Sequence, residues 1–320
     1  MAYRLPFGTS LRYLLASSSI AYLSYYLIDN APQLWETLYN RVFFGEEPWL
    51  FIMLIICYAM SWLIASLQFY LPLKRFGVDI GKSENLALFV AGVMLNYTPF
   101  KAGTIYRFDY MKERYGVSYS KFAGLQVTRI LGTIGVSGMV GSLAIVAIYI
   151  SGKFIPLELI IIVAALLLIA FTPFHLMKYK GNIRLGIFST PIDELLDALE
   201  NLKNDSKQAA QFLLLIGLQL FVLILQYWLV FKIANIEPHV ITYFLLIPFI
   251  AVLGMISLSP GNLGIREVVT ASTMSLSNGT FELGMLVGVV ERSVLLAATL
   301  IFGMCSLAYL TYLKRLGKQG

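Results

Sequence analysis

Charged side chains occur inside or beside long apolar runs of this 320-residue sequence. They are Lys101, Arg129, Arg266, Glu267, Glu291 and Arg292. A charge near the centre of a bilayer costs about 2.5–3.5 kcal/mol on insertion scales, so such residues normally face a protein interior or a wet cavity and carry a function. Arginine binds phosphate oxygens in a bidentate way and stays charged when buried. The pattern predicts that Arg129, Arg266 and Arg292 bind phosphate, while the two glutamates balance charge or relay protons.

Two proline–glycine breaks interrupt the apolar runs, one at Pro99 with Gly103 and one at Pro260 with Gly261 and Gly264. A helix that restarts after each proline has unpaired N–H groups and a partial positive charge at its N-terminus. Inside a membrane such a terminus is suited to an anion. The glycines also permit tight turns and close helix packing, which is the simpler explanation for them.

A purely structural interpretation of the charges stands beside the functional one. Arg266–Glu267 and Glu291–Arg292 would form buried ion pairs that tie a helical hairpin to the following span. The basic residues after the first break would instead anchor at anionic lipid headgroups. These are Lys101, Arg107, Lys112 and Arg114, of which Lys101 and Arg107 are also candidate substrate-binding residues.

The composition indicates a polytopic membrane protein, with 58% hydrophobic and 13% charged residues. Soluble domains have about 45–50% and about 25%, respectively. Cys57 and Cys305 fall in apolar runs, and His175 and His239 fall in expected loops, so we predict neither a disulfide framework nor a metal site. The sequence has no phosphate-loop motif, and we expect no cofactor. The net charge of +6 is more typical of loop asymmetry than of nucleic-acid binding.

The expected fold is all-α, with about six full transmembrane helices and two broken, re-entrant helical hairpins. The apolar runs cover 11–28, 49–71, 84–98, 121–150, 157–174, 209–232, 240–258 and 281–312. Because a span needs about 20 apolar residues, most of these runs are long enough to cross. The runs 84–98 and 240–258 end at the two breaks, and each is followed by another short helix. This is the pattern of discontinuous helices in transporters. No cleavage site follows 11–28, so we expect a retained first helix.

The distribution of Lys and Arg predicts the orientation. If both broken segments return to the face that they entered from, 18 basic residues lie on the side of the termini and 4 on the other side, namely Arg41, Lys153, Lys232 and Arg266. The positive-inside rule then places both termini in the cytoplasm, and we expect a multi-pass protein of the cell membrane.

The two broken segments resemble each other and predict an internal repeat. Thr98 to Gly103 aligns with Ser259 to Gly264, and Arg129 aligns with Arg292 further along. The chain then forms one membrane domain, 1–320, with halves of about 1–150 and 151–320 that run in opposite orientation. In transporters with inverted repeats the substrate site lies between the halves near the bilayer midplane.

The segment 192–203 has leucines on one helical face, at Leu195, Leu196, Leu199 and Leu202. This spacing predicts a helix that lies at the cytoplasmic membrane surface. A helix that docks a partner protein is the alternative.

The second break also resembles a family signature. Pro260-Gly261-Asn262-Leu263-Gly264-Ile265-Arg266-Glu267 is similar to the P-G-x-L-G-x-R-E motif of the lysylphosphatidylglycerol synthase transmembrane-region family, also called flippase-like membrane proteins. Pro99, Gly103 and Arg107 resemble the first-half pattern of that family, although Phe100 and Lys101 stand where small residues are usual. Glu291–Arg292 and Arg129 resemble its later charged positions.

The resemblance implies a membrane domain that moves a lipid between leaflets. The lipid in the best-known members is an aminoacylated phosphatidylglycerol, and relatives occur beside polyprenyl-phosphate glycosyltransferases. Aminoacylating members carry a large soluble synthase domain after the membrane part, whereas this sequence ends at Gly320, so we expect no lysine transfer.

The leading functional hypothesis is a flippase-like transporter of an anionic lipid. Its cargo would be an aminoacylated or glycosylated phospholipid or a polyprenyl phosphate, held in a central polar cavity that opens alternately to each leaflet. One alternative is an accessory subunit of a lipid-linked glycosyltransferase pathway, with a glycosyltransferase or a second copy of the chain as partner. The other is a polyprenyl-phosphate phosphatase-type enzyme, for which the sequence offers few acids and no suitable nucleophile.

Overall fold

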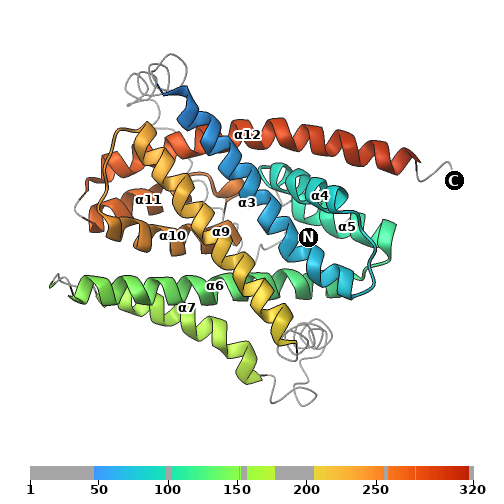
Figure 1. Cartoon of the computed structure of the whole chain (residues 1–320), viewed down its shortest axis with the longest axis horizontal. Helices are drawn as coiled ribbons and strands as arrows, with labels where there is room; N and C mark the ends of the chain where they lie inside the picture. The colour runs from blue at the N-terminus through green and yellow to red at the C-terminus, as the bar shows by residue number, and fades with distance from the viewer. Residues whose placement is uncertain are drawn as a thin grey trace, which may run out of the picture.

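The computed structural model describes residues 47–98, 102–150, 152, 157–176, 205–255, 259–277 and 279–316. The described elements are all helical, as predicted: α3 (Pro48–Arg75), α4 (Lys82–Leu95), α5 (Ala102–Tyr115), α6 (Tyr119–Ile150), α7 (Leu157–Leu176), α9 (Ser206–Ile233), α10 (Val240–Met255), the 3₁₀ turn η5 (Pro260–Asn262), α11 (Ile265–Leu276) and α12 (Phe281–Leu316) (Figure 1). The predicted helices at 11–28 and 192–203 lie outside the described residues, as do Pro99 and Lys101.

Four of the described helices are long and apolar enough to cross a membrane: α3, α6, α9 and α12. They correspond to four of the six predicted full spans. The predicted span 157–174 corresponds to α7, whose apolar stretch Ile160–Thr172 is shorter. The helices leave large apolar side chains uncovered, for example Leu214 on α9, which is 71% exposed. Such surfaces suit contact with lipid tails.

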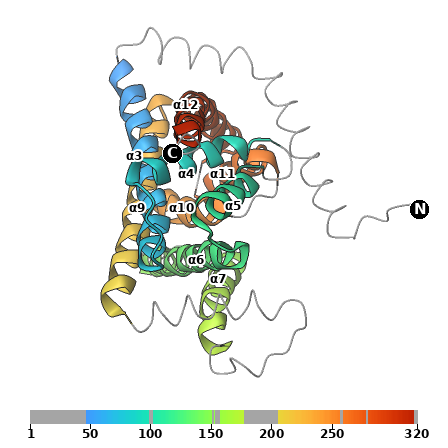
Figure 2. The ribbon, with the colours of Figure 1, turned by 90° about the vertical axis from the view of Figure 1, so that its right-hand side faces the viewer.

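Helices α3 and α9 pack against each other along their lengths and run in opposite directions (Figures 1 and 2). Polar side chains join them within the bundle. The Gln68 amide donates to Gln219 Oε1 at 2.7 Å, and Gln226 donates to the carbonyl of Cys57 at 3.0 Å. The α3–α9 pair lies along one face of the molecule and passes α12 toward one end and α6 toward the other (Figures 1 and 2).

One short helix of each hairpin packs on the long helix of the opposite half of the chain. Helix α4 lies on α12, and α10 lies on α6. Helix α7 also packs on α6, where small residues allow close approach: a Cβ at Gly138 would meet Leu167, and one at Gly141 would meet Val163. The two sequence halves are thus interleaved and do not form separate bodies.

Each sequence break becomes a short antiparallel helical hairpin. In the first hairpin, α4 and α5 are so close that a Cβ at Gly103 would lie 1.8 Å from the carbonyl oxygen of Gly92. At its other end the Tyr110 hydroxyl donates to Glu84 at 2.6 Å. In the second hairpin, α10 and α11 are joined by a hydrogen bond between Thr242 and Ser277 at 2.8 Å. The first of these helices ends earlier than predicted, at Leu95 rather than at 98, whereas residues 256–258 of the second predicted segment lie outside the described residues.

Helix α9 begins at an Asp205 cap that also binds Arg75 at the end of α3. The Gln208 backbone N–H donates to the Asp205 carboxylate at 2.9 Å, and the Arg75 guanidinium forms an ion pair with it. The Gln208 N–H and then Arg75 lower the pKa of Asp205. An acid with a lowered pKa stabilises the fold above its ordinary pKa of about 4, and this contribution is lost as the pH falls through the folded-state value.

Asp205→Asn keeps a good helix cap but removes the charge, so we expect a lower Tm at pH 7 in detergent. The difference from wild type should begin to shrink below about pH 4, where Asp205 of the unfolded chain becomes protonated, and should vanish as the pH falls through the lower pKa of the folded state. A difference that stays constant between pH 7 and pH 3 would contradict this role of the Asp205 charge.

Candidate functional site

The tip of the second hairpin is a turn that requires glycine. Gly261 has a φ of 59° and Gly264 a φ of 80°, a backbone conformation that other residues rarely adopt. The tips of the two hairpins touch, because the Gly261 N–H donates to the carbonyl of Asn96 at 3.0 Å. A Cβ at Gly261 would lie 2.5 Å from a ring carbon of Tyr97. The glycine therefore permits the two breaks to meet inside the bundle.

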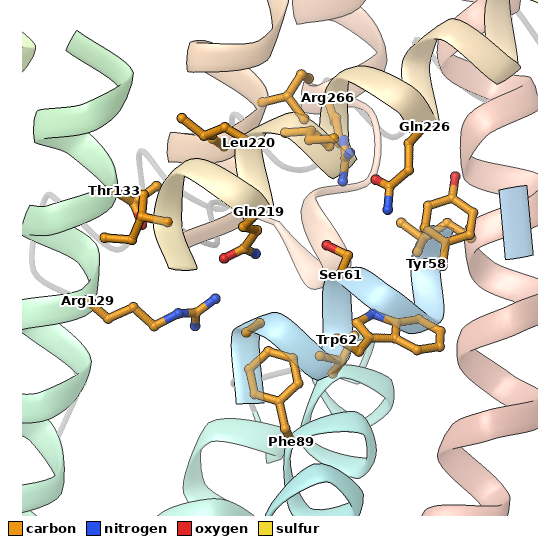
Figure 3. Close-up of a pocket in the computed structure, with 18 residues that line it drawn as sticks. Tyr58, Ser61, Trp62, Phe89, Arg129, Thr133, Gln219, Leu220, Gln226 and Arg266 are labelled. Carbon is orange, nitrogen blue, oxygen red and sulfur yellow. The ribbon is translucent and has the colours of Figure 1, made fainter. Parts of the chain in front are cut away.

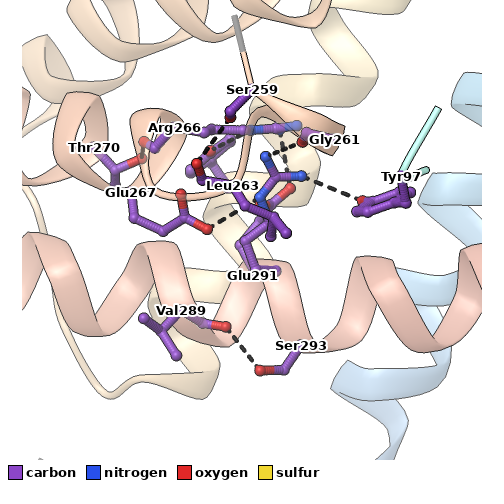
Figure 4. A network of polar contacts seen from close by, with 12 residues as sticks. Tyr97, Ser259, Gly261, Leu263, Arg266, Glu267, Thr270, Val289, Glu291 and Ser293 are labelled. Carbon is purple, nitrogen blue, oxygen red and sulfur yellow. Dashed lines mark hydrogen bonds and ion pairs between the residues drawn. The ribbon is translucent and has the colours of Figure 1, made fainter. Parts of the chain in front are cut away.

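Two buried ion pairs connect α11 to α12 in a crossed arrangement (Figure 4). Arg266 Nη2 lies 2.9 Å from Glu291 Oε1, and Arg292 Nε lies 3.2 Å from Glu267 Oε1. Both carboxylate side chains are only 1% exposed. The two helices come this close because α12 carries glycines where they touch: a Cβ at Gly288 would lie 2.9 Å from the Cα of Glu267.

Each arginine of these pairs has further polar partners. Arg292 donates to the Gly261 carbonyl at 2.6 Å and to the Tyr97 hydroxyl at 3.3 Å, so it also holds the two hairpin tips. Arg266 donates to the Tyr227 hydroxyl at 3.3 Å. The ion pairs that the structural interpretation expected are thus present; all four of their residues belong to the second half, and the Tyr97 hydroxyl adds a contact from the first half.

The start of α11 carries its own anion. Its first turn contains the Glu267 carboxylate, and negative charge there is favourable because of the partial positive charge of the helix N-terminus. The anion site predicted at the second break therefore already has a carboxylate of the chain beside it. The corresponding turn of α5 has no acidic residue.

The basic residues of the first half lie elsewhere. Arg107 on α5 and Arg129 on α6 are each 6% exposed. Headgroup anchoring is therefore wrong for Arg107, whose side chain lies over Gly92 inside the protein. Arg114 forms an ion pair with Glu84 at 3.0 Å, and Lys112 is exposed. Arg266, which was counted among the basic residues of the outer side, is buried in the ion pair described above.

A cavity of about 180 Å³ lies between these two groups of charges (Figure 3). Arg129 lines it from α6 and Arg266 lines it from α11, so both halves contribute a cation. Gln219 and Gln226 of α9 and Ser61 of α3 add polar groups, while aromatic and aliphatic side chains complete the wall. The cavity is therefore an apolar chamber with a few inward polar groups, the usual character of a ligand site.

The predicted residues thus fall into two clusters. Arg266, Glu267, Glu291 and Arg292 meet at the second hairpin with Gly261 and Gly264, whereas Arg107 and Arg129 lie together at the first. Gly103 lies between α4 and α5.

Several polar residues of the site were not predicted from the sequence: Tyr58, Gln68, Tyr97, Gln219, Gln226 and Tyr227. Glutamines inside the apolar runs 49–71 and 209–232 are the signal that could have found three of them, because amides are costly in hydrocarbon. Within the described ranges no group of three or more His, Cys, Asp or Glu could hold a metal ion.

Comparison with known proteins gives one match. The family model of the lysylphosphatidylglycerol synthase TM region matches residues 11–303. No curated protein and no solved structure matches the chain. The matched range covers every helix described above except the last turns of α12, and it includes both hairpins and both clusters of charges. The chain belongs to the lysylphosphatidylglycerol synthase transmembrane-region family.

Proposed function

We propose that the protein moves a lipid with an anionic headgroup between the leaflets of the cell membrane. The observation that carries the proposal is the internal cavity with Arg129 at one side and Arg266 at the other. Its volume of about 180 Å³ has room for a headgroup but not for a whole lipid. The headgroup would enter the cavity while the acyl chains stay in the bilayer.

The proposed mechanism is alternating exposure of this cavity between two inverted halves, with both hairpins re-entrant and both termini in the cytoplasm. The antiparallel α3–α9 pair supports such a repeat, since equivalent helices of inverted halves must run in opposite directions. The exchanged packing of α4 on α12 and of α10 on α6 also supports it. In inverted-repeat transporters the site lies at this kind of interface and rocking of one part exposes it to either side.

The test is transport by purified protein in liposomes. Headgroup-labelled anionic and zwitterionic lipids are placed in the membrane, and a quencher is added outside. We expect wild type to expose the anionic label faster than protein-free liposomes and faster than the zwitterionic label. No acceleration of either lipid would contradict the proposal.

A matched pair of variants tests whether the lipid headgroup passes through the cavity. Ser61→Phe fills the cavity, whereas Ser293→Phe makes the same change on the exposed side of α12. We expect the first to slow transport to near the protein-free rate and the second to leave it unchanged. Equal rates for both variants would mean that the lipid takes another path.

A further inference from the structure

Arg107 and Arg129 are buried cations for which the described residues supply no carboxylate. Each is 6% exposed, and neither takes part in an ion pair with any residue of the described ranges. The two arginines of the second half differ in this respect, because each has its own glutamate. We call Arg107 and Arg129 the first-half arginine pair.

The first-half arginine pair shares two aromatic rings. The guanidinium carbon of Arg107 lies 5.7 Å from the ring centroid of Phe69 and 5.4 Å from that of Phe89. The guanidinium carbon of Arg129 lies 5.1 Å and 5.4 Å from the same two centroids. Two like charges therefore lie around one pair of rings, and they repel each other in a region from which water is largely excluded.

Most of the N–H groups of the pair have no acceptor among the residues that the structure describes. A guanidinium has five donors. Arg129 donates through Nε to Gln68 Oε1 at 2.7 Å, and Nε of Arg107 is buried without a partner among the described residues. Arg129 faces the cavity (Figure 3), so a group inside the cavity can reach its free donors.

The aromatic rings attract cations but do not neutralise them, and taking a charge out of water is costly unless an opposite charge is near. Two buried arginines whose N–H groups lack acceptors in the described part of the chain therefore need a bound anion to balance their positive charge. The planar fork of arginine fits phosphate oxygens. Among the described residues, Arg266 and Arg292 already have carboxylate partners, which leaves the first-half arginine pair able to receive an anion.

We propose that Arg129, which lines the cavity, and Arg107, which lies against the same two rings, form a phosphate-binding site at the first-half side of the cavity, while the main role of the paired Arg266 and Arg292 is to hold the second hairpin in place. This inference rests on the proposed function and names the group that receives the headgroup. A lipid phosphodiester and free inorganic phosphate share the required chemistry, and the experiment separates them.

The experiment measures binding to the purified full-length protein in nonionic detergent by calorimetry. The probes are inorganic phosphate and a short-chain phosphatidylglycerol, with short-chain diacylglycerol as the lipid without phosphate. We expect Arg107→Gln and Arg129→Gln each to weaken binding by roughly tenfold or more, which corresponds to about 1.4 kcal/mol. Arg129→Lys keeps the charge but not the fork and should fall between wild type and Arg129→Gln.

Two surface lysines on the same helices are matched controls. Lys112 on α5 lies 4.3 Å from the ring centroid of Tyr119, and Lys121 on α6 lies 4.3 Å from that of Phe76. Lys112→Gln and Lys121→Gln each remove one positive charge next to an aromatic ring, and we expect both to bind like wild type. If the lysine variants bind phosphate as weakly as the arginine variants, the effect depends on net charge alone and the proposed site is wrong.

Thermal unfolding gives an independent readout. In phosphate-free buffer Arg129→Gln should not lower the Tm, because it relieves repulsion within the pair, and phosphate should raise the Tm of wild type but not of the variant. A marked fall in Tm without phosphate, together with unchanged binding, would make Arg129 a structural residue and overturn the proposal.

The probes also identify the source of the phosphate. Binding of both probes in competition supports a phosphate site open to either source, and binding of the lipid alone supports a lipid headgroup site. If wild type binds neither probe, the proposal is wrong. Because this assay needs no transport, loss of binding in the arginine variants supports the site even if the liposomes show no lipid movement. Transport with unchanged binding in those variants would support the function and reject the site.

Discussion

Replacing Glu291 with glutamine is expected to lower the free energy of unfolding by about 3–5 kcal/mol, the usual cost of removing one partner from a buried ion pair. Arg266 has its carboxylate partner in Glu291 at 2.9 Å, with side chains that are 13% and 1% exposed. Without that carboxylate the guanidinium stays largely buried, and among the described residues it keeps the neutral Tyr227 hydroxyl as its hydrogen-bond partner. Denaturant unfolding of the purified protein in mixed micelles measures the loss.

A double variant separates the missing charge from the missing contact. Arg266→Leu with Glu291→Leu removes both charges, and we expect it to regain most of the lost stability, since apolar replacement of a buried pair is often neutral. The exposed pair Lys314–Glu113 is the control, because Glu113→Gln should cost less than about 1 kcal/mol. Similar losses in the free energy of unfolding for Glu291→Gln and Glu113→Gln would show that the buried ion pair stabilises the protein no more than the exposed pair does.

Gly103→Ala is expected to destabilise the protein by about 2 kcal/mol or more, because the added methyl group has no space. The new Cβ would lie 1.8 Å from the backbone oxygen of Gly92, and a backbone atom inside a packed helix cannot move aside as a flexible side chain can. Helices α4 and α5 would have to separate. Size-exclusion chromatography and thermal unfolding of the detergent-solubilised protein measure the effect.

Gly217→Ala is the matched control for this change. Gly217 lies in α9, and a Cβ there would meet nothing within 4 Å. Alanine in a helix is favoured over glycine by about 0.5–1 kcal/mol, so this variant should be as stable as wild type or slightly more stable. If Gly103→Ala is as stable as Gly217→Ala, the close contact between α4 and α5 does not exist as described.

The sequence alone predicted the helices that depend on local signals. Runs of apolar residues predicted α3, α6, α9 and α12 to within a few residues, since hydrocarbon thickness sets the length of such helices. The breaks at Pro99 and Pro260 predicted where the short helices end and restart. The burial of Arg129 and Arg292 followed from their position inside apolar spans.

The pairing of the charges could not be predicted. Arg266 and Glu267 are neighbours in sequence, as are Glu291 and Arg292, and the spacing alone allows several arrangements. The crossed pairing depends on how α11 is aligned with α12, which the contacts of Gly284 with Ala271 and of Gly288 with Glu267 determine. Such a register is a property of two packed surfaces and has no signature in either segment.

The burial of Arg107 could not be predicted from the sequence either. It lies in a segment with many charges, where a location at the membrane surface is the natural interpretation. Only the fold shows that α5 turns its Arg107 toward Phe69 and Phe89 and leaves Lys112 exposed. A hairpin has two sides, and its partner helices decide which one is buried.

The exchanged packing of the short helices has a consequence for biosynthesis. Helix α4 leaves the ribosome well before α12, whose surface covers it and which begins almost 200 residues later, at Phe281. The first hairpin must therefore wait, without this neighbour, until α12 has been synthesised. A chain that stops before Phe281 would leave this hairpin without the helix that covers it, so the packing of an early segment depends on one that is synthesised much later.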